Sequence, residues 1–415
     1  MTRALYTITS VLHNEVVPKA SEEKFIKDIE AALGIGFEHH EADFSSYGSA
    51  DESYIYVRTG GTEGIFKSIF CKNGMLSIPG RVRLLTSGLS NSLAASMEIL
   101  SYLGNNGIPG EIIHGTPEQI ASRITSGSTD TFKSVVAPLK PGRVLEGERL
   151  GVVGHPSDWL ISSDVDYRKA YENLGVELVD IPMQELLDEF HALKDVPELP
   201  FELKPLNSPK YGKPFAPQDF PDALKVYGAL KKLILKYRLT GLTIRCFDLL
   251  TSIHNTGCMA LAILNAEGIT ATCEGDVPAM LTMAAARRIC HVPAFQVNLA
   301  RTDGHEFNFA HCTIPLNMVR DYVYETHFES GFGVAVHGEL ETGDATVFKI
   351  GAGTDRFMVK DAQLTGNRYG ANLCRTQIVV ETEGLQDYFL KESLGNHHIV
   401  LLGHHAEELK KALSK

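Results

Sequence analysis

The sequence lacks the features that mark exported, membrane-spanning and nucleic-acid-binding proteins. Its N-terminus, MTRALYTITSVLHNE, shows strand-like alternation followed by charge, where a signal peptide or a membrane span would have an apolar run. Basic residues are also few, with 39 Lys and Arg against 51 Asp and Glu and a formal net charge of −12. Nucleic acids and anionic membranes attract basic patches, so we expect neither as a partner.

Paired cysteines are absent as well. The seven cysteines are scattered, their number is odd, and none belongs to a CxxC pair. In a chain of this size that pattern argues against a disulfide framework. We therefore expect reduced thiols and a cytoplasmic protein.

What the sequence does contain is typical of a globular protein. Hydrophobic residues make up 44% and charged residues 22% of the chain. At 415 residues the chain is longer than one hydrophobic core usually serves. We expect two or three domains.

The first predicted domain, residues 1–143, alternates strands with helices. RALYTITSVL, SYIYVRTGG and RVRLLTS indicate strands, and the helix of SEEKFIKDIEAALG has Ser21 as its expected N-cap and Gly34 as its stop. Such alternation predicts parallel βαβ units, whose strand-end loops often hold ligands. TGGTE (59–63) and TSGLSNS (86–92) are candidate contact loops, although they also suit ordinary strand–helix junctions.

The second predicted domain, residues 144–324, follows a linker-like stretch at 137–148 and repeats the alternation. Its expected strands are RLGVVGHP, VELVDIP, GLTIRCFD, ITATCEGD and PAFQVNLA. Between them, residues 195–222 are rich in proline and have no periodicity. Such a long irregular loop is often functional, as a lid or a subunit contact.

The third predicted domain, residues 325–415, changes character. VAVHGEL, ATVFKIG, RFMVKDAQLTG and TQIVVET are short β runs that indicate an antiparallel sheet or barrel. A last strand and helix, HHIVLLG and HAEELKKALSK, could pack back on the second domain. The predicted fold class is α/β, with two Rossmann-like domains of parallel βαβ units followed by a β-rich, barrel-like domain.

Acidic residues end two neighbouring strands of the second domain. Asp248 ends TIRCFD, while Glu274 and Asp276 end ITATCEGD. Carboxylates that meet at one sheet edge repel each other unless a cation lies between them, and oxygen ligands favour Mg²⁺ or Mn²⁺. The alternative is that Asp248 and Asp276 only cap the helices that follow them.

Histidines are candidates for the remaining ligand. His397 directly precedes an apolar strand, in a late cluster that also holds His398, His404 and His405. His311, in EFNFAHCTIP, also follows an apolar strand and could reach the same pocket. For each of them, a surface position or a structural hydrogen bond is the alternative.

Taken together, four segments resemble the L-fucose isomerase and L-arabinose isomerase superfamily, in particular its shorter fucose-isomerase-like members. The segments are RCFDLLT (245–251), ALAILNAEGITATCEGDVPAMLTM (260–283), FNFAHCTIP (307–315) and GNHHIVLLGHHAEEL (395–409). On this resemblance, Asp276 matches the second acid of an E-x-D motif and His397 matches an N-H histidine. Asp248 stands where the L-fucose enzymes have the longer glutamate.

The resemblance implies an enzyme that interconverts an open-chain aldose and its ketose through an enediol. Its implied cofactor is Mn²⁺, or another divalent cation such as Mg²⁺ or Co²⁺, held by Asp248, Asp276 and His397. Asp248 and Asp276 would also move the proton, with Glu274 as a hydrogen-bond partner. The family further implies a homo-oligomer, a trimer or hexamer, with active sites near the subunit interfaces.

The sugar substrate stays open. Arg245, Arg287, Arg301 and Arg375 suit an anionic group such as a sulfonate or phosphate, whereas a neutral deoxy sugar or pentose would need none of them. His311, Arg245 and Glu274 are the candidate substrate contacts. The competing functions are a metal-dependent aldolase or lyase on the same residues, and a non-catalytic sugar-binding protein on the same scaffold.

Overall fold

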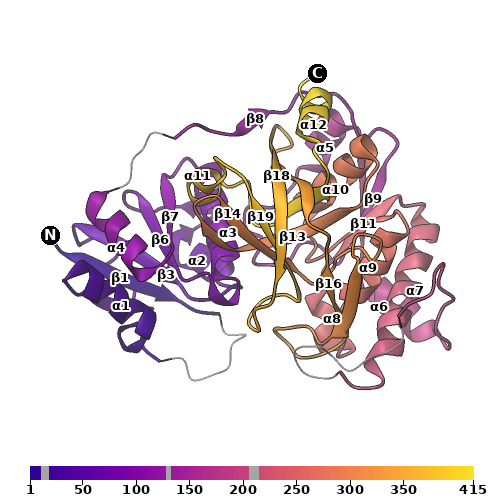
Figure 1. Cartoon of the computed structure of the whole chain (residues 1–415), viewed down its shortest axis with the longest axis horizontal. Coiled ribbons are helices and arrows are strands. Elements are labelled where there is room, and N and C mark those ends of the chain that lie inside the picture. The colour runs from indigo at the N-terminus through magenta and orange to yellow at the C-terminus, as the bar shows by residue number, and fades with distance from the viewer. Residues whose placement is uncertain (11–17, 128–131, 205–214) are drawn as a thin grey trace.

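A computed structural model of the chain describes residues 1–10, 18–127, 132–204 and 215–415. It is a mixed α/β structure in which two parallel sheets flank a closed antiparallel barrel. Figure 1 shows the barrel strands, orange to yellow, between the indigo-to-magenta N-terminal part and the pink second part. The prediction of parallel sheets combined with a β-rich part is confirmed in these general terms.

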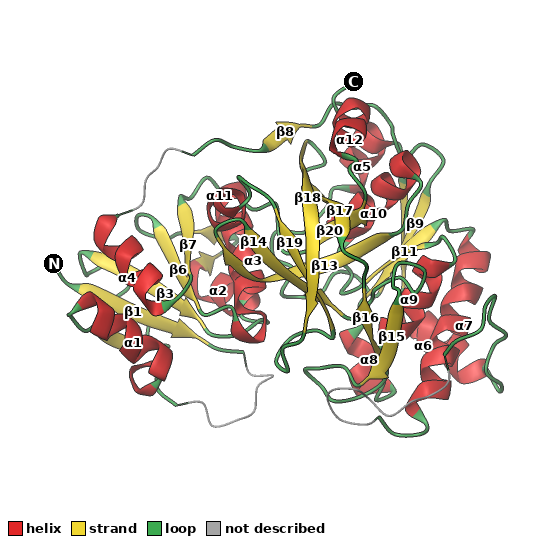
Figure 2. Cartoon of the chain, viewed as in Figure 1, coloured by secondary structure: helices red, strands yellow, loops and turns green. Residues whose placement is uncertain are grey.

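The N-terminal unit, the described residues up to 127, is a five-stranded sheet of order β2-β1-β3-β6-β7 in which all pairs are parallel. Its main strands are β1 (Arg3–Ile8), β2 (Glu38–Glu41), β3 (Glu52–Val57), β6 (Val82–Thr86) and β7 (Gly110–His114). Its helices are α1 (Lys24–Leu33), α2 (Glu63–Phe70), α3 (Ser92–Asn105) and α4 (Pro117–Ser126), with short 3-10 helices at Ala20–Glu22 and Leu89–Asn91 and a small ribbon of β4 (Cys71–Lys72) and β5 (Met75–Leu76). Helices α1 and α4 pack together on one face, while α2 and α3 pack together and α3 also contacts the barrel (Figure 2).

The ends of α1 differ in part from the prediction. The helix begins at Lys24 after the uncapped residue Glu23, because Ser21 lies in the preceding 3-10 turn. Gly34 ends the helix as predicted, with a φ of 70° that suits a residue without Cβ.

The second unit, residues 149–290, is a four-stranded parallel sheet of order β10-β9-β11-β12. Its strands are β9 (Arg149–Val153), β10 (Glu177–Ile181), β11 (Gly241–Ile244) and β12 (Thr270–Thr272). Its helices are α5 (Tyr167–Leu174), α6 (Met183–Ala192), α7 (Asp219–Tyr237), α8 (Phe247–Ser252), α9 (Cys258–Ala266) and α10 (Val277–Cys290). Of the long loop predicted at 195–222, residues 205–214 lie outside the described part, and α7 begins within its last residues.

The barrel closes because β17 pairs with both β20 and β18, in the order β17-β20-β13-β14-β19-β18. Its strands are β13 (Ala294–Asp303), β14 (Glu306–His311), β17 (Gly343–Ile350), β18 (Arg356–Arg368), β19 (Thr376–Glu381) and β20 (His398–Leu402). Around it lie β8 (Val136–Pro138), which pairs with β18, the ribbon of β15 (Asp321–Glu325) and β16 (Ala335–Glu339), α11 (Gln386–Lys391) and α12 (Ala406–Leu413).

The structure moves two predicted boundaries. Strands β13 and β14 belong to the barrel, although the sequence assigned them to the second domain at 144–324, and β8 joins the barrel from within 1–143. The change from parallel sheet to barrel therefore falls between α10 and β13 rather than at 324. A short buried strand has the same apolar pattern in a parallel and in an antiparallel sheet, so the pattern alone could not place it.

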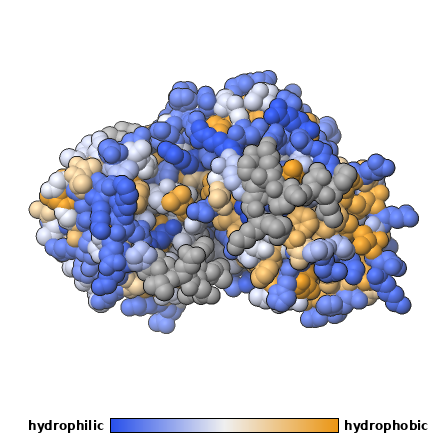
Figure 3. Space-filling view, turned by 60° about the horizontal axis from the view of Figure 1, so that its bottom comes forward, coloured by the Kyte–Doolittle hydropathy of each residue, from blue (hydrophilic) through white to orange (hydrophobic). Residues whose placement is uncertain are grey.

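Two hydrophobic cores join the barrel to its neighbours. One continuous cluster includes residues of the N-terminal sheet, α3, α11 and the barrel, and a second packs α10 and α12 against the outside of β17 and β20. Figure 3 shows hydrophobic residues gathered on the second unit, whereas much of the remaining visible surface is hydrophilic. No helix within the described ranges is long and apolar enough to cross a membrane.

Substitution of Phe389 tests how much the first of these cores contributes to stability. Phe389 is fully buried on α11, and its ring lies 5.3 Å from that of Phe307 and 5.9 Å from that of Phe309. We expect Phe389→Ala to lower the free energy of unfolding by about 3–5 kcal/mol, because it leaves a cavity between α11 and the barrel. Leu235→Ala, at a side chain that is 75% exposed, is the control and should change it by less than about 0.5 kcal/mol in the same denaturation experiment.

Candidate metal centre

A cavity of about 190 Å³ opens where the N-terminal unit, the second unit and the barrel meet. The N-terminal unit contributes the loops predicted to bind ligands, and the other walls come from the second unit, the end of β14, the segment after β15 and the segment before β20. The polar residues that line it are Glu63, Asn91, Trp159, Glu274, Asn298, His311, His327, Glu329, Ser330 and Asn396. Titratable and amide side chains from distant parts of the sequence therefore share one space.

Glu274 owes its position to a strained turn after β12. Its φ is 65°, which is uncommon for a residue with a side chain, and Gly275 follows with a φ of 68°. A Cβ on Gly275 would lie only 2.5 Å from the His155 carbonyl oxygen, so the turn requires glycine there. The indole Nε1 of Trp159 donates to Glu274 Oε2 at 2.6 Å and fixes the carboxylate.

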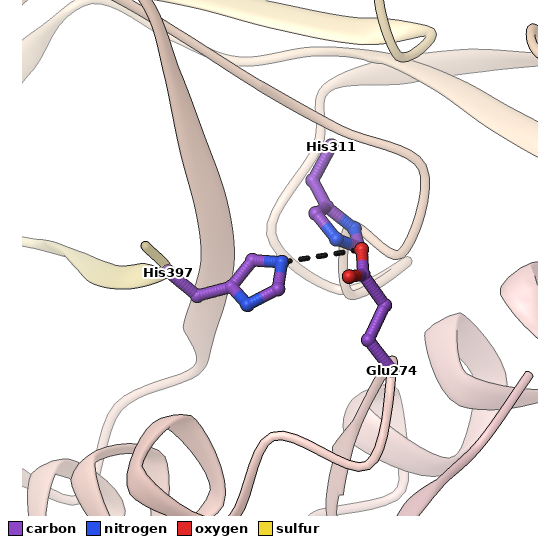
Figure 4. Close-up of side chains that lie close together, drawn as sticks. All are labelled: Glu274, His311 and His397. Carbon is purple, nitrogen blue, oxygen red and sulfur yellow. Dashed lines mark ion pairs between the residues drawn. The ribbon is translucent and has the colours of Figure 1, made fainter. Parts of the chain in front are cut away.

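His397 lies between two carboxylates, just before β20. It is fully buried, with Nδ1 at 2.8 Å from Asp276 Oδ2 and Nε2 at 3.3 Å from Glu274 Oε1 (Figure 4). Burial alone would lower the pKa of the imidazole, but Glu274 and Asp276 outweigh it and raise this pKa to about 10. Nε2 makes no hydrogen bond of good geometry within the described residues.

Asp276 contacts the Nδ1 side of the His397 imidazole. Its Oδ1 accepts from the Ala279 N–H at 2.7 Å and caps α10, while Oδ2 pairs with His397. Burial opposes the charged form, but Lys349 and His397 together hold the pKa of Asp276 at about 2. Both carboxylate oxygens of Asp276 thus have a hydrogen-bond partner, and the carboxylate fixes the orientation of His397.

His311 completes the group from the end of β14. Its ring meets the His397 ring edge to face at a centroid distance of 5.4 Å, and its Nδ1 lies 2.9 Å from the Thr313 hydroxyl. Burial lowers the pKa of His311 to about 4, so the imidazole is neutral near pH 7. A neutral imidazole has the lone pair that metal binding needs.

These residues fit a divalent metal ion. One donor atom from each of Glu274, His311 and His397 lies within 4.8 Å of the other two, and the three side chains point toward one another in Figure 4. The His397 Nε2 without a hydrogen bond is directed at this group, and Asp276 holds Nδ1 in the manner of the carboxylates that orient metal-bound histidines. Two imidazoles and one carboxylate form a recognised ligand set for divalent transition metals.

The structure differs from the predicted set of Asp248, Asp276 and His397, because of these three only His397 belongs to the group. Asp276 supports His397, and Glu274, predicted as a hydrogen-bond partner, contributes a donor atom to the group instead. Asp248 lies in the first turn of α8, partly exposed, and ion-pairs with Arg245 at 3.0 Å. The helix-start alternative therefore describes Asp248 better than a metal ligand does.

The predicted arginines lie elsewhere. Arg245 also pairs with Asp158 at 2.7 Å, and Arg375 is buried against Glu325 and the Thr326 carbonyl. Arg287 donates to the Asn265 carbonyl. None of these, nor Arg301, is among the described residues that line the cavity.

Two further carboxyl groups of the cavity wall were missed by sequence reasoning. Glu63 is 2% exposed, and burial, reinforced by neighbouring carboxylates, raises its pKa well above the ordinary value. Glu329 is exposed when the whole residue is considered, but protein atoms surround its carboxyl group. The resulting desolvation, together with the negative charge of Glu274, raises the pKa of Glu329 to about 8. Glu63 ends the TGGTE loop already indicated by the sequence, whereas no local pattern identifies Glu329.

By contrast, the pKa of Glu274 is lowered. Burial opposes this, but His397 and then His311 favour the charged carboxylate, and the Trp159 hydrogen bond adds to their effect. The cavity thus holds one carboxylate with a lowered pKa together with two carboxyl groups, Glu63 and Glu329, whose pKa values are raised. Two titratable groups in one site whose pKa values are displaced in opposite directions commonly act as acid and base.

Comparisons with known proteins add no family to this description. No family model matches the chain, and no curated protein matches its sequence. The resemblance inferred from the four segments therefore stays a prediction, and the function has to be argued from the geometry.

Gly275 tests how the Glu274 position depends on the turn. We expect Gly275→Ala to lower the affinity for Mn²⁺ by at least about tenfold, because the Cβ would collide with the His155 carbonyl and displace the adjacent ligand. Gly384→Ala is the matched control, since Gly384 has a similar φ of 80° but nothing within 4 Å of the added Cβ. Calorimetric Mn²⁺ titration and thermal unfolding of both variants separate the two effects, and equal affinities would contradict the assigned role of the turn.

Proposed function

We propose that this chain is a metal-dependent aldose–ketose isomerase acting on a small open-chain sugar. The observation that carries the proposal is that Glu274 and His311, which line the cavity, form a group with the buried His397 beside it, and that Glu274 and Glu329 in the same cavity have pKa values displaced in opposite directions. The metal-dependent form of this isomerisation uses a cation beside the sugar's carbonyl and hydroxyl oxygens, and groups that remove a proton from C2 and deliver one to C1. The resemblance of the four sequence segments supports the same reaction.

The ligand set favours a particular group of metals. Mg²⁺ prefers oxygen ligands in octahedral geometry, whereas imidazoles suit transition metals. With two imidazoles and one carboxylate, we propose Mn²⁺, with Co²⁺ as the next candidate and Mg²⁺ as the weakest. When bound, the ion would polarise the carbonyl oxygen as a Lewis acid.

The protein groups divide the proton transfer between them. Glu274 is ionised and lies beside the reacting carbons in this proposal, so it can accept the proton from C2. Glu274 then returns this proton to C1. Glu329, with a pKa of about 8, can protonate the carbonyl oxygen at C1 as the enediol forms and take a proton back from the C2 hydroxyl as the ketose forms. Asn91 orients Glu329 by donating to its Oε1 at 3.0 Å. Asp276, predicted as a catalytic acid, becomes a positioning residue that acts through His397.

Trp159 gives the cavity an apolar surface. Its indole lies edge to face with Phe247 at a centroid distance of 4.7 Å while donating to Glu274. An aromatic face suits the C–H face of a sugar, and the absence of arginine among the described lining residues favours a neutral sugar over a sulfonated or phosphorylated one. We therefore propose a deoxy sugar or a pentose as the substrate class.

The predicted oligomer and cytoplasmic location remain proposals. Walls of the cavity come from all three parts of one chain, so a partner subunit would add to a site that already has its metal ligands. Sedimentation velocity of the purified protein would distinguish a trimer or hexamer from a monomer.

His397 provides the direct test of the function. We expect the Mn²⁺-loaded protein to form ketose from a deoxy sugar or pentose, and His397→Ala to abolish this activity by about a thousandfold or more because a ligand is lost. A screen by chromatography of neutral and acidic aldoses measures it, with His305→Ala, whose side chain is 60% exposed, as the histidine control.

Asp276→Asn refines that test. It should keep the α10 cap but weaken the hold on His397, lowering Mn²⁺ affinity by about 10- to 100-fold. If the wild-type protein cleaves a carbon–carbon bond of the sugar instead of forming ketose, the aldolase alternative is correct. If it binds sugar without converting it, the sugar-binding alternative is correct.

Glu329 predicts a pH dependence. Its raised pKa means that the protonated form persists up to about pH 8, so an acid role gives a rate that holds below that pH and is lost above it. We expect kcat/KM to fall about tenfold per pH unit above pH 8. In Glu329→Gln the maximum should be lower and this decline absent, while Mn²⁺ affinity is retained; an unchanged alkaline limb in the variant would assign it to another group.

A further inference from the structure

A second group of metal-binding side chains lies at the opposite end of α10 from Asp276. It consists of Cys290, the last residue of α10, together with His405 and Glu408 at the start of α12. One donor atom of each lies within 4.8 Å of the other two. The proposed isomerase reaction uses none of them.

The contacts of His405 determine which of its two ring nitrogens carries the hydrogen. Its Nε2 lies 3.1 Å from the Leu402 carbonyl oxygen, which can only accept, so Nε2 must carry the hydrogen. In the neutral ring Nδ1 then has a lone pair, and it faces Glu408 Oε2 at 3.5 Å. Two acceptors that face each other at this distance provide lone pairs that a metal ion between them could share.

The surroundings hold His405 in place for this contact. The His405 and Ala406 N–H groups both donate to Asp361 Oδ1, at 3.1 and 3.0 Å, which fixes the start of α12 on the barrel. Gly403, with a φ of 97°, permits the ring to approach, since a Cβ there would lie 2.8 Å from His405 Nε2. A histidine whose second nitrogen donates to a backbone carbonyl is the common arrangement of metal-bound histidines.

The third donor selects the metal. Cys290 is 9% exposed, and burial together with Glu408 raises the pKa of its thiol to about 12, so a metal ion would have to displace its proton. Among the described residues, the ion pair of Glu408 is with His405 and not with a lysine or arginine. Sulfur, imidazole and carboxylate together match Zn²⁺, and the half-exposed Glu408 leaves a fourth position to water.

We propose that Cys290, His405 and Glu408 form a Zn²⁺ site that fastens the C-terminal helix α12 to the end of α10. The site is separate from the catalytic group and has different chemistry. It contains a thiolate, whereas the Glu274–His311–His397 group contains nitrogen and oxygen donors. Each site can therefore be measured in the presence of the other.

The test uses the full-length protein, freed of metal with a chelator and then titrated with Co²⁺ as a spectroscopic substitute for Zn²⁺. Wild type is expected to bind two equivalents and to show the near-ultraviolet charge-transfer band of a thiolate bound to Co²⁺. Cys290→Ser should lose this band and one equivalent, and Zn²⁺ should displace the band from the wild type. Glu408→Gln, a surface change that leaves the fold intact, should weaken Zn²⁺ binding at this site by at least about tenfold.

Three control variants distinguish the two sites. Cys71→Ser and His404→Ala, which change a thiol and an imidazole outside the group, should keep both equivalents and the band. His397→Ala should lose the catalytic equivalent but keep the band. A band that persists in Cys290→Ser, or a wild type without any thiolate band, would overturn the Zn²⁺ proposal, whatever the outcome for the isomerase activity.

Discussion

The His397 imidazole, fully buried between Asp276 and Glu274, is the contact on which the rest of the site depends. Two carboxylates inside a protein repel each other and lose their hydration, so they stay ionised only if a positive group lies between them. Satisfying this constraint forces the turn after β12, the start of α10 and the segment before β20 to converge. Glu98 of α3 connects the N-terminal unit to the segment before β20, because its Oε2 accepts a hydrogen bond from the Asn396 N–H at 2.9 Å.

Charge is distributed around this contact in a way that separates the roles of the carboxyl groups. Glu274 and Asp276 are held ionised by His397, with Lys349, fully buried in the barrel, acting on Asp276. For Glu329, desolvation of the carboxyl group and then the negative charge of Glu274 raise the pKa. The same local field therefore displaces the pKa values of two glutamates in opposite directions, and a divalent ion in place of the His397 proton would add one positive charge between the carboxylates.

Helix α10 connects the two proposed metal sites. Asp276 caps its N-terminus beside the Glu274–His311–His397 group, and Cys290 ends it beside α12. Its 14 residues span about 21 Å, and its apolar face is buried against β17 and β20 of the barrel. Fastening α12 to the far end of this helix would restrict its movement along the barrel and thus support the position of Asp276. The ligand types differ at the two ends, nitrogen and oxygen at one and sulfur at the other, which would direct different metals to them.

The sequence by itself determined the alternation of strands and helices, the acids that follow β12 and the position of His397 just before an apolar strand, because strand ends and apolar periodicity are local properties. It did not determine which acid faces the cavity. Glu274 and Asp276 are two residues apart, and only the left-handed turn at Glu274 and Gly275 directs one to the metal group and the other behind His397. The tertiary structure also decided that β13 and β14 belong to the barrel, which brings His311 next to His397 across 86 residues. Such pairings depend on contacts between distant segments, and no local pattern in the chain records them.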